Sequence, residues 1–323
     1  MRTIFFGVDF FKVEKLYSRI LLLNGGLHMN HFILSCESTT DLPYHYLTER
    51  KLPVICYTYI INNHAYEDNM ERNPDLMPKF YKMLEKGFLP TTSQINEASY
   101  YDFFESLLEQ GDLLHITFSS GMSGSANNAY QAAAALKKKY PNRKFQIIDS
   151  LSGAGGYGLL VDYAADMRDN GCSLEETASW VLKNRTRIHH QFFTTDLKFL
   201  RQSGRISGTA SHLASILNIY PFIRLDQNGM ADAYGKVRGR LRAVRETVSE
   251  MEFYAKNGTD YDGKCFISHA NCPDIAHQLK HSILSSFPHI HTPIRILNAG
   301  TITASHCGPG SAGIFFLGSE RPY

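Results

Sequence analysis

Short apolar runs alternate with stretches of helical periodicity through most of this chain. The runs at residues 32–34, 113–118 and 145–148 have the length and composition of buried strands. Apolar spacing predicts a helix around residues 101–108, and an alanine-rich stretch at residues 126–139 predicts another. Strands that alternate with helices build parallel sheets, because each crossover needs a long connection. The sequence therefore predicts an α/β fold with a mainly parallel sheet in the N-terminal part.

Extended apolar runs recur in the C-terminal half and again alternate with helical stretches. They lie at residues 192–193, 219–225, 265–267 and 294–297. A turn at residues 226–230 predicts a hairpin, so part of this second sheet is expected to be antiparallel. With 323 residues, of which 43% are hydrophobic, the chain is long enough for two domains. We predict an N-terminal α/β domain at 29–165 and a C-terminal α/β domain with a mixed sheet at 166–323, with a ligand between them.

Charge and cysteine content argue against several classes of protein. The net charge of +2, from 33 basic and 31 acidic residues, gives no general attraction to nucleic acid or to an anionic membrane. The six cysteines lack the short paired spacings of a zinc site and suit free thiols in the cytoplasm. Charged residues separate the apolar stretches of residues 1–28 into short pieces, and no later segment is expected to span a bilayer. We expect a cytoplasmic protein with no bound metal, no nucleic acid partner and no integral membrane association.

Two hydroxyl-rich segments flank the helix predicted around residues 101–108 and the strand predicted at residues 113–118. Thr92 and Ser93 belong to the first, and Ser119 and Ser123 belong to the second, which follows a strand and precedes a helix. Loop N–H groups and the helix dipole favour a small anion at such a place. Because the side chains are hydroxyls and not Lys or Arg, a carboxylate suits the place better than a phosphate. The two segments are predicted to be short loops that bind a carboxylate, and ordinary caps and turns are the alternative.

Six segments, in this order, resemble the DegV family. They are residues 38–43 (STTDLP), 92–94 (TSQ), 119–124 (SSGMSG), 199–206 (FLRQSGRI), 236–239 (KVRG) and 306–310 (HCGPG). The resemblance covers almost everything after Met29, so residues 1–28 are interpreted as an added element or a start-site artefact. The chain departs from the family at Glu37, where Asp is usual, and at Ser203-Gly204, where paired glycines are usual.

The resemblance implies a bacterial protein that binds a long-chain fatty acid in a buried tunnel. Some members of the family serve as the lipid-binding subunit of a fatty acid kinase and present the acyl carboxylate to the catalytic subunit, which forms the acyl phosphate. The bound fatty acid is then the only ligand expected, with no cofactor. The family's carboxylate-binding hydroxyls correspond to Thr92 and Ser123, and its head-group histidine is assigned to His269.

Physical chemistry agrees with these assignments. A carboxylate buried in an apolar tunnel needs several converging hydrogen-bond donors, and a protonated His269 would add a charge-assisted bond. The surroundings of a carboxylate that a kinase must reach are expected to be basic, so Arg205, and after it Arg201, is the predicted contact with the partner. The chain has no G-x-x-x-x-G-K-[ST] loop of its own for a triphosphate. Secondary candidates for the head-group site are Ser93, Ser119 and Asn271.

Two other functions fit single motifs. Residues 153–158 (GAGGYG) match the G-x-G-x-x-G of dinucleotide-binding enzymes, but four residues separate them from the preceding strand. A serine hydrolase that uses Ser123 is the second alternative, although Ser125 replaces the last glycine of the G-x-S-x-G motif. No adjacent acid is indicated to orient His269 or His306 as its base. We favour a lipid-binding protein without catalytic residues over both enzymes.

Overall fold

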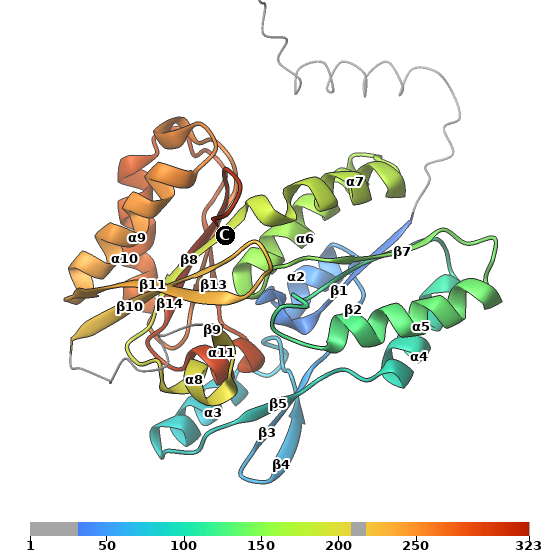
Figure 1. Cartoon of the computed structure of the whole chain (residues 1–323), viewed down its shortest axis with the longest axis horizontal. Coiled ribbons are helices and arrows are strands. Elements are labelled where there is room, and N and C mark those ends of the chain that lie inside the picture. Colours follow the sequence, from blue (N-terminus) through green and yellow to red (C-terminus); the bar gives the residue numbers. More distant parts are fainter. Residues whose placement is uncertain (1–31, 208–217, 323) are drawn as a thin grey trace, which may run out of the picture.

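The described residues form two larger sheets and one small sheet (Figure 1). This computed structural model describes residues 32–207 and 218–322. The extension predicted at residues 1–28 therefore lies outside the described residues. The N-terminal sheet is parallel and consists, in spatial order, of β2 (Val54–Ile55), β1 (Ile33–Glu37), β6 (Leu113–Thr117) and β7 (Phe145–Asp149).

Both faces of the N-terminal sheet are buried. Successive side chains of a strand point to opposite faces, and Leu113 and Leu114 of β6 accordingly belong to different cores. The core of Leu113 contains side chains of α4 (Glu97–Leu108) and α5 (Ser125–Lys139). The core of Leu114 contains side chains of α2 (Tyr44–Glu49), α6 (Ala154–Asp169) and α7 (Leu174–Asn184). The predicted α/β class with a parallel sheet is confirmed.

The first hydroxyl-rich segment lies in the small antiparallel sheet. We predicted a loop there, and this was wrong: Thr91–Ser93 form strand β5, in which Thr92 pairs with Tyr59 of β3 (Thr58–Ile61). A strand of three residues is too short to show a periodicity in the sequence. Its hydrogen bonds come from a partner strand far away in the sequence. Strand β4 (His64–Glu67) completes the sheet, and α3 (Leu76–Glu85) packs on it.

The C-terminal sheet is mixed, as predicted. The turn at residues 226–230 closes a hairpin between its strands β10 and β11, and Gly229 in this turn has a φ of 74°. Strands β12 and β13 pair in parallel, and so do β9 and β11. In spatial order the strands are β13 (Arg295–Asn298), β12 (Cys265–His269), β14 (Ala312–Leu317), β8 (Ile188–Phe193), β10 (Ile219–Leu225), β11 (Ala231–Arg238) and β9 (Ile206–Ser207).

Helices cover this sheet on both faces. Helices α9 (Arg240–Tyr254) and α10 (Pro273–Ser286) lie on one face (Figure 1). Their side chains share a core with Ile267 and Ile314. On the other face, Phe266 and Phe315 join the core that contains α6. The remaining helices of the described residues are α8 (Lys198–Ser203), α11 (Thr301–Cys307) and the 3-10 turns η1 (Ser38–Thr40), η2 (Arg185–Arg187) and η4 (Gly258–Asp260).

Helix α6 packs against the C-terminal sheet and against η1 through its glycines. A Cβ atom at Gly156 would lie 2.2 Å from His190 Nε2, and one at Gly155 would lie 2.5 Å from Ser268 Oγ. On the other side, a Cβ at Gly158 would lie 2.4 Å from the carbonyl oxygen of Thr40. These approaches are too close for any other residue type. Close packing thus accounts for the GAGGYG motif without a bound dinucleotide.

The division of the chain into two domains stays a prediction. The proposed boundary between residues 165 and 166 lies inside α6, which is shared between the two larger sheets. Among the described helices, none has the length and apolar character needed to cross a bilayer.

Candidate binding site

A cavity lies among η1, α8, α11, the start of α6 and the strands of the C-terminal sheet. It encloses about 1030 Å³ of empty space, part of which is open to solvent. Much of its wall is apolar, which suits a hydrocarbon chain. The apolar side chains come from both halves of the chain and include Phe118, Met122, Phe192, Leu200, Leu225, Ile302 and Phe315.

The two hydroxyl-rich segments meet at this cavity. Thr92 of β5 and Ser123 of the loop before α5 both line it. The segments touch, because a Cβ atom at Gly124 would lie 2.8 Å from the side-chain amide of Gln94. Ser123 Oγ donates a hydrogen bond to Ser125 Oγ over 3.1 Å. The structure therefore brings together the two hydroxyls that the sequence assigned to a carboxylate.

His306 is the histidine that contacts the first of these hydroxyls, that of Thr92. Its Nε2 atom lies 2.9 Å from Thr92 Oγ1, and its Nδ1 atom has no hydrogen-bond partner among the described residues. Burial, and after it the charge of Arg205, lowers the pKa of His306 to about 4, so the ring is neutral at pH 7. From the sequence, we weighed His306 only as the base of a serine hydrolase. The signal that could have identified it is its place at the head of the HCGPG segment.

His269 also lines the cavity, at the end of β12. Its Nδ1 atom accepts a hydrogen bond from the backbone N–H of Cys272 at 3.3 Å. Burial lowers the pKa of this imidazole, with a smaller contribution from His277. The protonated form that we expected at the head group is therefore disfavoured in the free protein.

The remaining candidates divide between the cavity and its surroundings. Ser93 lines the cavity, and its hydroxyl donates to the carbonyl of Thr58 at 3.4 Å. Ser119 does not line it, because its hydroxyl donates to the Gly229 carbonyl at 2.9 Å. Asn271 lies in an exposed turn with a φ of 54°. The positions of Ser119 and Asn271 do not support the head-group roles that we predicted for these two residues.

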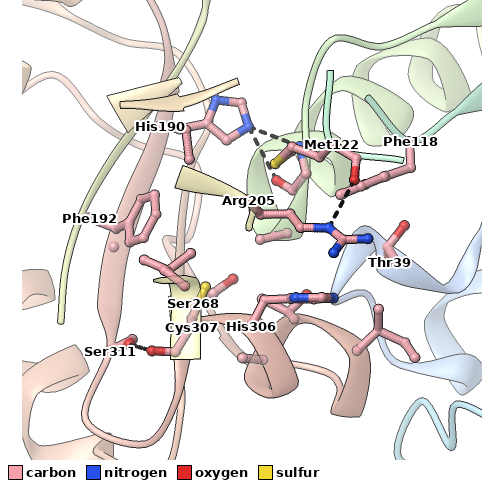
Figure 2. A pocket seen from close by; sticks show the side chains of 18 of the residues that line it. Thr39, Phe118, Met122, His190, Phe192, Arg205, Ser268, His306, Cys307 and Ser311 are labelled. Carbon is pink, nitrogen blue, oxygen red and sulfur yellow. Dashed lines mark hydrogen bonds between the residues drawn. The ribbon is translucent and has the colours of Figure 1, made fainter. Parts of the chain in front are cut away.

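The two candidate arginines differ in position. Arg205 is half-buried and lines the cavity, where its Nε atom donates to the carbonyl of Met122 at 3.3 Å. Figure 2 shows its guanidinium on the same side of the cavity as the His306 ring. Arg201 lies in the last turn of α8 and is not among the residues that line the cavity.

The arrangement does not form the triad of a serine hydrolase. His306 contacts Thr92 and not Ser123, whose hydrogen bonds go to Ser125. No carboxylate within the described ranges bonds to His306 Nδ1 to orient the ring. Nor do the described residues contain a cluster of three or more His, Cys, Asp or Glu that could hold a metal ion.

Two buried carboxylates hold the N-terminus of α11, which carries His306. Asp41 Oδ1 accepts hydrogen bonds from the Gly300 backbone N–H at 3.0 Å and the Thr303 hydroxyl at 2.8 Å. Asp68 Oδ1 accepts from the Thr301 hydroxyl at 2.7 Å. Burial, together with a smaller repulsion from Asp68, raises the pKa of Asp41 to about 7.

This raised pKa predicts a pH dependence of folding stability. The folded state prefers protonated Asp41, so its stabilising contribution is full below the unfolded pKa of about 4 and is lost as the pH rises through 7. Asp41→Asn should remove this dependence. We expect the free energy of unfolding of the parent, relative to the variant, to fall by about 2–3 kcal/mol between pH 5 and pH 8. Urea titrations at several pH values measure it, and parallel curves for the two proteins would contradict it.

Comparison with known proteins identifies related sequences over almost the whole described chain. The family described as "Uncharacterised protein, DegV family" matches residues 33–319. A DegV domain-containing protein of Clostridium perfringens is 33% identical over 295 residues, which cover 91% of this chain and 99% of that protein. One from Caldanaerobacter subterraneus is 29% identical over 290 residues, covering 89% of this chain and 99% of that protein.

Solved structures share the fold. A DegV family protein from Thermus thermophilus, described as binding fatty acid, has a TM-score of 0.78 and 24% identity, and the match covers 89% of this chain and 99% of that one. The fatty acid kinase (Fak) B3 protein of Streptococcus pneumoniae, loaded with linoleic acid, has a TM-score of 0.75 and 19% identity, with 88% of this chain and 99% of that chain covered.

Proposed function

This chain belongs to the DegV family, and from that premise we propose that it binds one long-chain fatty acid in the cavity described above. The observation that carries the proposal is the meeting of Thr92, Ser123 and His306 in a cavity whose wall is largely apolar. A buried carboxylate is costly unless several donors converge on it. The solved relatives that hold fatty acids lend support through their shared fold.

We propose that Thr92 and Ser123 bind the acyl carboxylate, and that His306 is the histidine that lies beside it. A neutral imidazole has one N–H, which can donate to Thr92 or to the ligand, depending on the tautomer. Hydroxyls rotate to suit, so both can turn their protons toward a carboxylate oxygen. His269, which the sequence assigned to the head group together with Thr92 and Ser123, also lines the cavity, and we place it second to His306.

The experiment is a comparison of bound lipid and palmitate affinity in the parent, Thr92→Val and Ser123→Ala. Denaturation of the parent should release one long-chain fatty acid per chain, which mass spectrometry detects. Each substitution removes one donor from a buried carboxylate and should weaken palmitate binding by about 1–3 kcal/mol, with the double variant losing less than the sum. The absence of bound lipid in the parent, together with no uptake of palmitate, would refute the proposal.

Ser93→Ala is the matched control for these variants. Its hydroxyl also borders the cavity but donates to the Thr58 carbonyl. We expect its palmitate affinity to stay within about 0.5 kcal/mol of the parent. A loss as large as that of the Thr92 variant would move the head-group site toward Ser93.

We further propose that the protein presents the bound carboxylate to a separate kinase catalytic subunit and performs no chemistry alone. The described cysteines carry free thiols, which suits a cytoplasmic location beside such a partner. Arg205 is the residue proposed to meet the transferred phosphoryl group or the partner, because it is half-buried and borders the cavity.

A further inference from the structure

Two hydroxyl groups in the cavity wall have no hydrogen-bond partner among the described residues. They belong to Thr39 of η1, which is 2% exposed, and Ser268 of β12, which is 5% exposed. Both line the cavity, and Figure 2 shows them with His306 around the same space. Buried hydroxyls are nearly always paired, so two orphans in one cavity wall indicate a missing polar partner.

The buried carboxyl group of Asp41 lies behind this wall. Thr303 also lines the cavity, and its hydroxyl proton is directed to Asp41. Its oxygen therefore has lone pairs left for a donor in the cavity. The Ser268 hydroxyl interacts with Asp41 closely enough to lower the pKa of that carboxyl, although the two groups make no hydrogen bond of ordinary length. The wall can thus accept a hydrogen bond, and the hydroxyls of Thr39 and Ser268, neither of which makes a hydrogen bond of ordinary length, can turn to donate one.

This wall lies near the head-group residues. Thr303 and His306 are three residues apart in α11, and residues at this spacing are neighbours on one face of a helix. His306 in turn contacts Thr92. A group bound between Thr303 and Ser268 would therefore lie near the acyl carboxylate that we assign to Thr92 and Ser123.

We propose that Thr39, Ser268 and Thr303 form a second polar subsite that recognises a hydroxyl group on the first carbons of the acyl chain. The inference rests on the proposed function and adds a ligand class to it, the 2- or 3-hydroxy fatty acids. An unsubstituted chain covers the two orphan hydroxyls without pairing them, whereas an alcohol both donates and accepts. Ordered water in place of the alcohol is the competing occupant.

The experiment compares palmitate, 2-hydroxypalmitate, 3-hydroxypalmitate and 16-hydroxypalmitate by competition for one labelled fatty acid. For the parent, we expect at least one of the 2- and 3-hydroxy acids to bind about three- to tenfold more tightly than palmitate. The 16-hydroxy acid should bind more weakly than palmitate, because its alcohol enters the apolar part of the cavity.

Variants that remove only the hydroxyls locate the effect. In Thr39→Val/Ser268→Ala the preference for a hydroxy acid over palmitate should disappear, while palmitate itself binds at least as tightly as to the parent. Ser311→Ala is the matched control, since Ser311 lines the same cavity but its hydroxyl already donates to the Cys307 carbonyl at 2.7 Å. This control should keep the preference.

The outcomes separate this inference from the proposed function. Tight binding of palmitate without any preference for a hydroxy acid would overturn the inference alone and would leave water as the occupant. A preference that survives in the Thr39/Ser268 double variant would also overturn it. Failure of all four acids to bind the parent would overturn the inference and the proposed function together.

Discussion

Arg205→Gln should reduce acyl phosphate formation by at least about 100-fold when the protein is combined with a fatty acid kinase catalytic subunit and ATP. Negative charge accumulates where the carboxylate attacks the phosphoryl group, and one lost donor at such a place costs about 10²–10³ in rate. Arg205 is positioned for this role, because it borders the cavity and its charge already lowers the pKa of His306.

The substitution is Gln, not Glu, because of where the structure places Arg205. A carboxylate at position 205 would repel the acyl carboxylate in the same cavity, so charge reversal would weaken lipid binding as well as transfer. Palmitate affinity of Arg205→Gln should change by less than about tenfold. Arg242→Gln, which alters an exposed arginine of α9, should leave both quantities unchanged. Normal transfer by Arg205→Gln would exclude Arg205 from the mechanism.

Arg201→Gln tests the second predicted contact. Arg201 does not line the cavity, so it could assist transfer only by contacting the surface of the kinase subunit. The two variants together distinguish a charge needed at the carboxylate from a charge needed for docking.

The fold was predictable because hydrophobic periodicity specifies which face of each element is buried. The alternation of Leu113 and Leu114 between two cores follows directly from a strand that is buried on both sides. The hairpin at residues 226–230 was predictable for a similar reason, since turn residues act locally. Such features depend on neighbours in the sequence and need no knowledge of distant segments.

The side-chain directions at the site depend on distant segments and were not predictable. Ser119 and Ser123 belong to one loop, yet the Gly229 carbonyl from a hairpin of the other sheet binds Ser119 and removes it from the cavity. Of the two histidines, His306 contacts Thr92 only because α11 packs beside β5, whereas His269 bonds within its own turn. Residue type, spacing and the family resemblance indicated segments that meet at the cavity but not the atoms that contact one another.

Glu37, which replaces the family's usual Asp, is the buried centre of a network that supports the cavity. It is 0% exposed, and it accepts hydrogen bonds from Tyr57 at 3.1 Å, Tyr100 at 2.5 Å and the Phe118 backbone N–H at 3.0 Å. Tyr57 and Phe118 line the cavity, while Tyr100 belongs to α4. The carboxylate thus ties the first strand to the small sheet, to α4 and to the loop that carries Ser123.

Glu37→Ala should therefore lower the free energy of unfolding by about 3–5 kcal/mol, because it leaves several buried donors unpaired and opens a cavity. Glu37→Asp should lie between the parent and the alanine variant, since it keeps the charge but shortens the reach by one methylene. Glu49→Ala, at an exposed position of α2, should stay within about 0.5 kcal/mol of the parent. Guanidinium unfolding measures all three, and a loss below about 1 kcal/mol for Glu37→Ala would show that water replaces the carboxylate in this network.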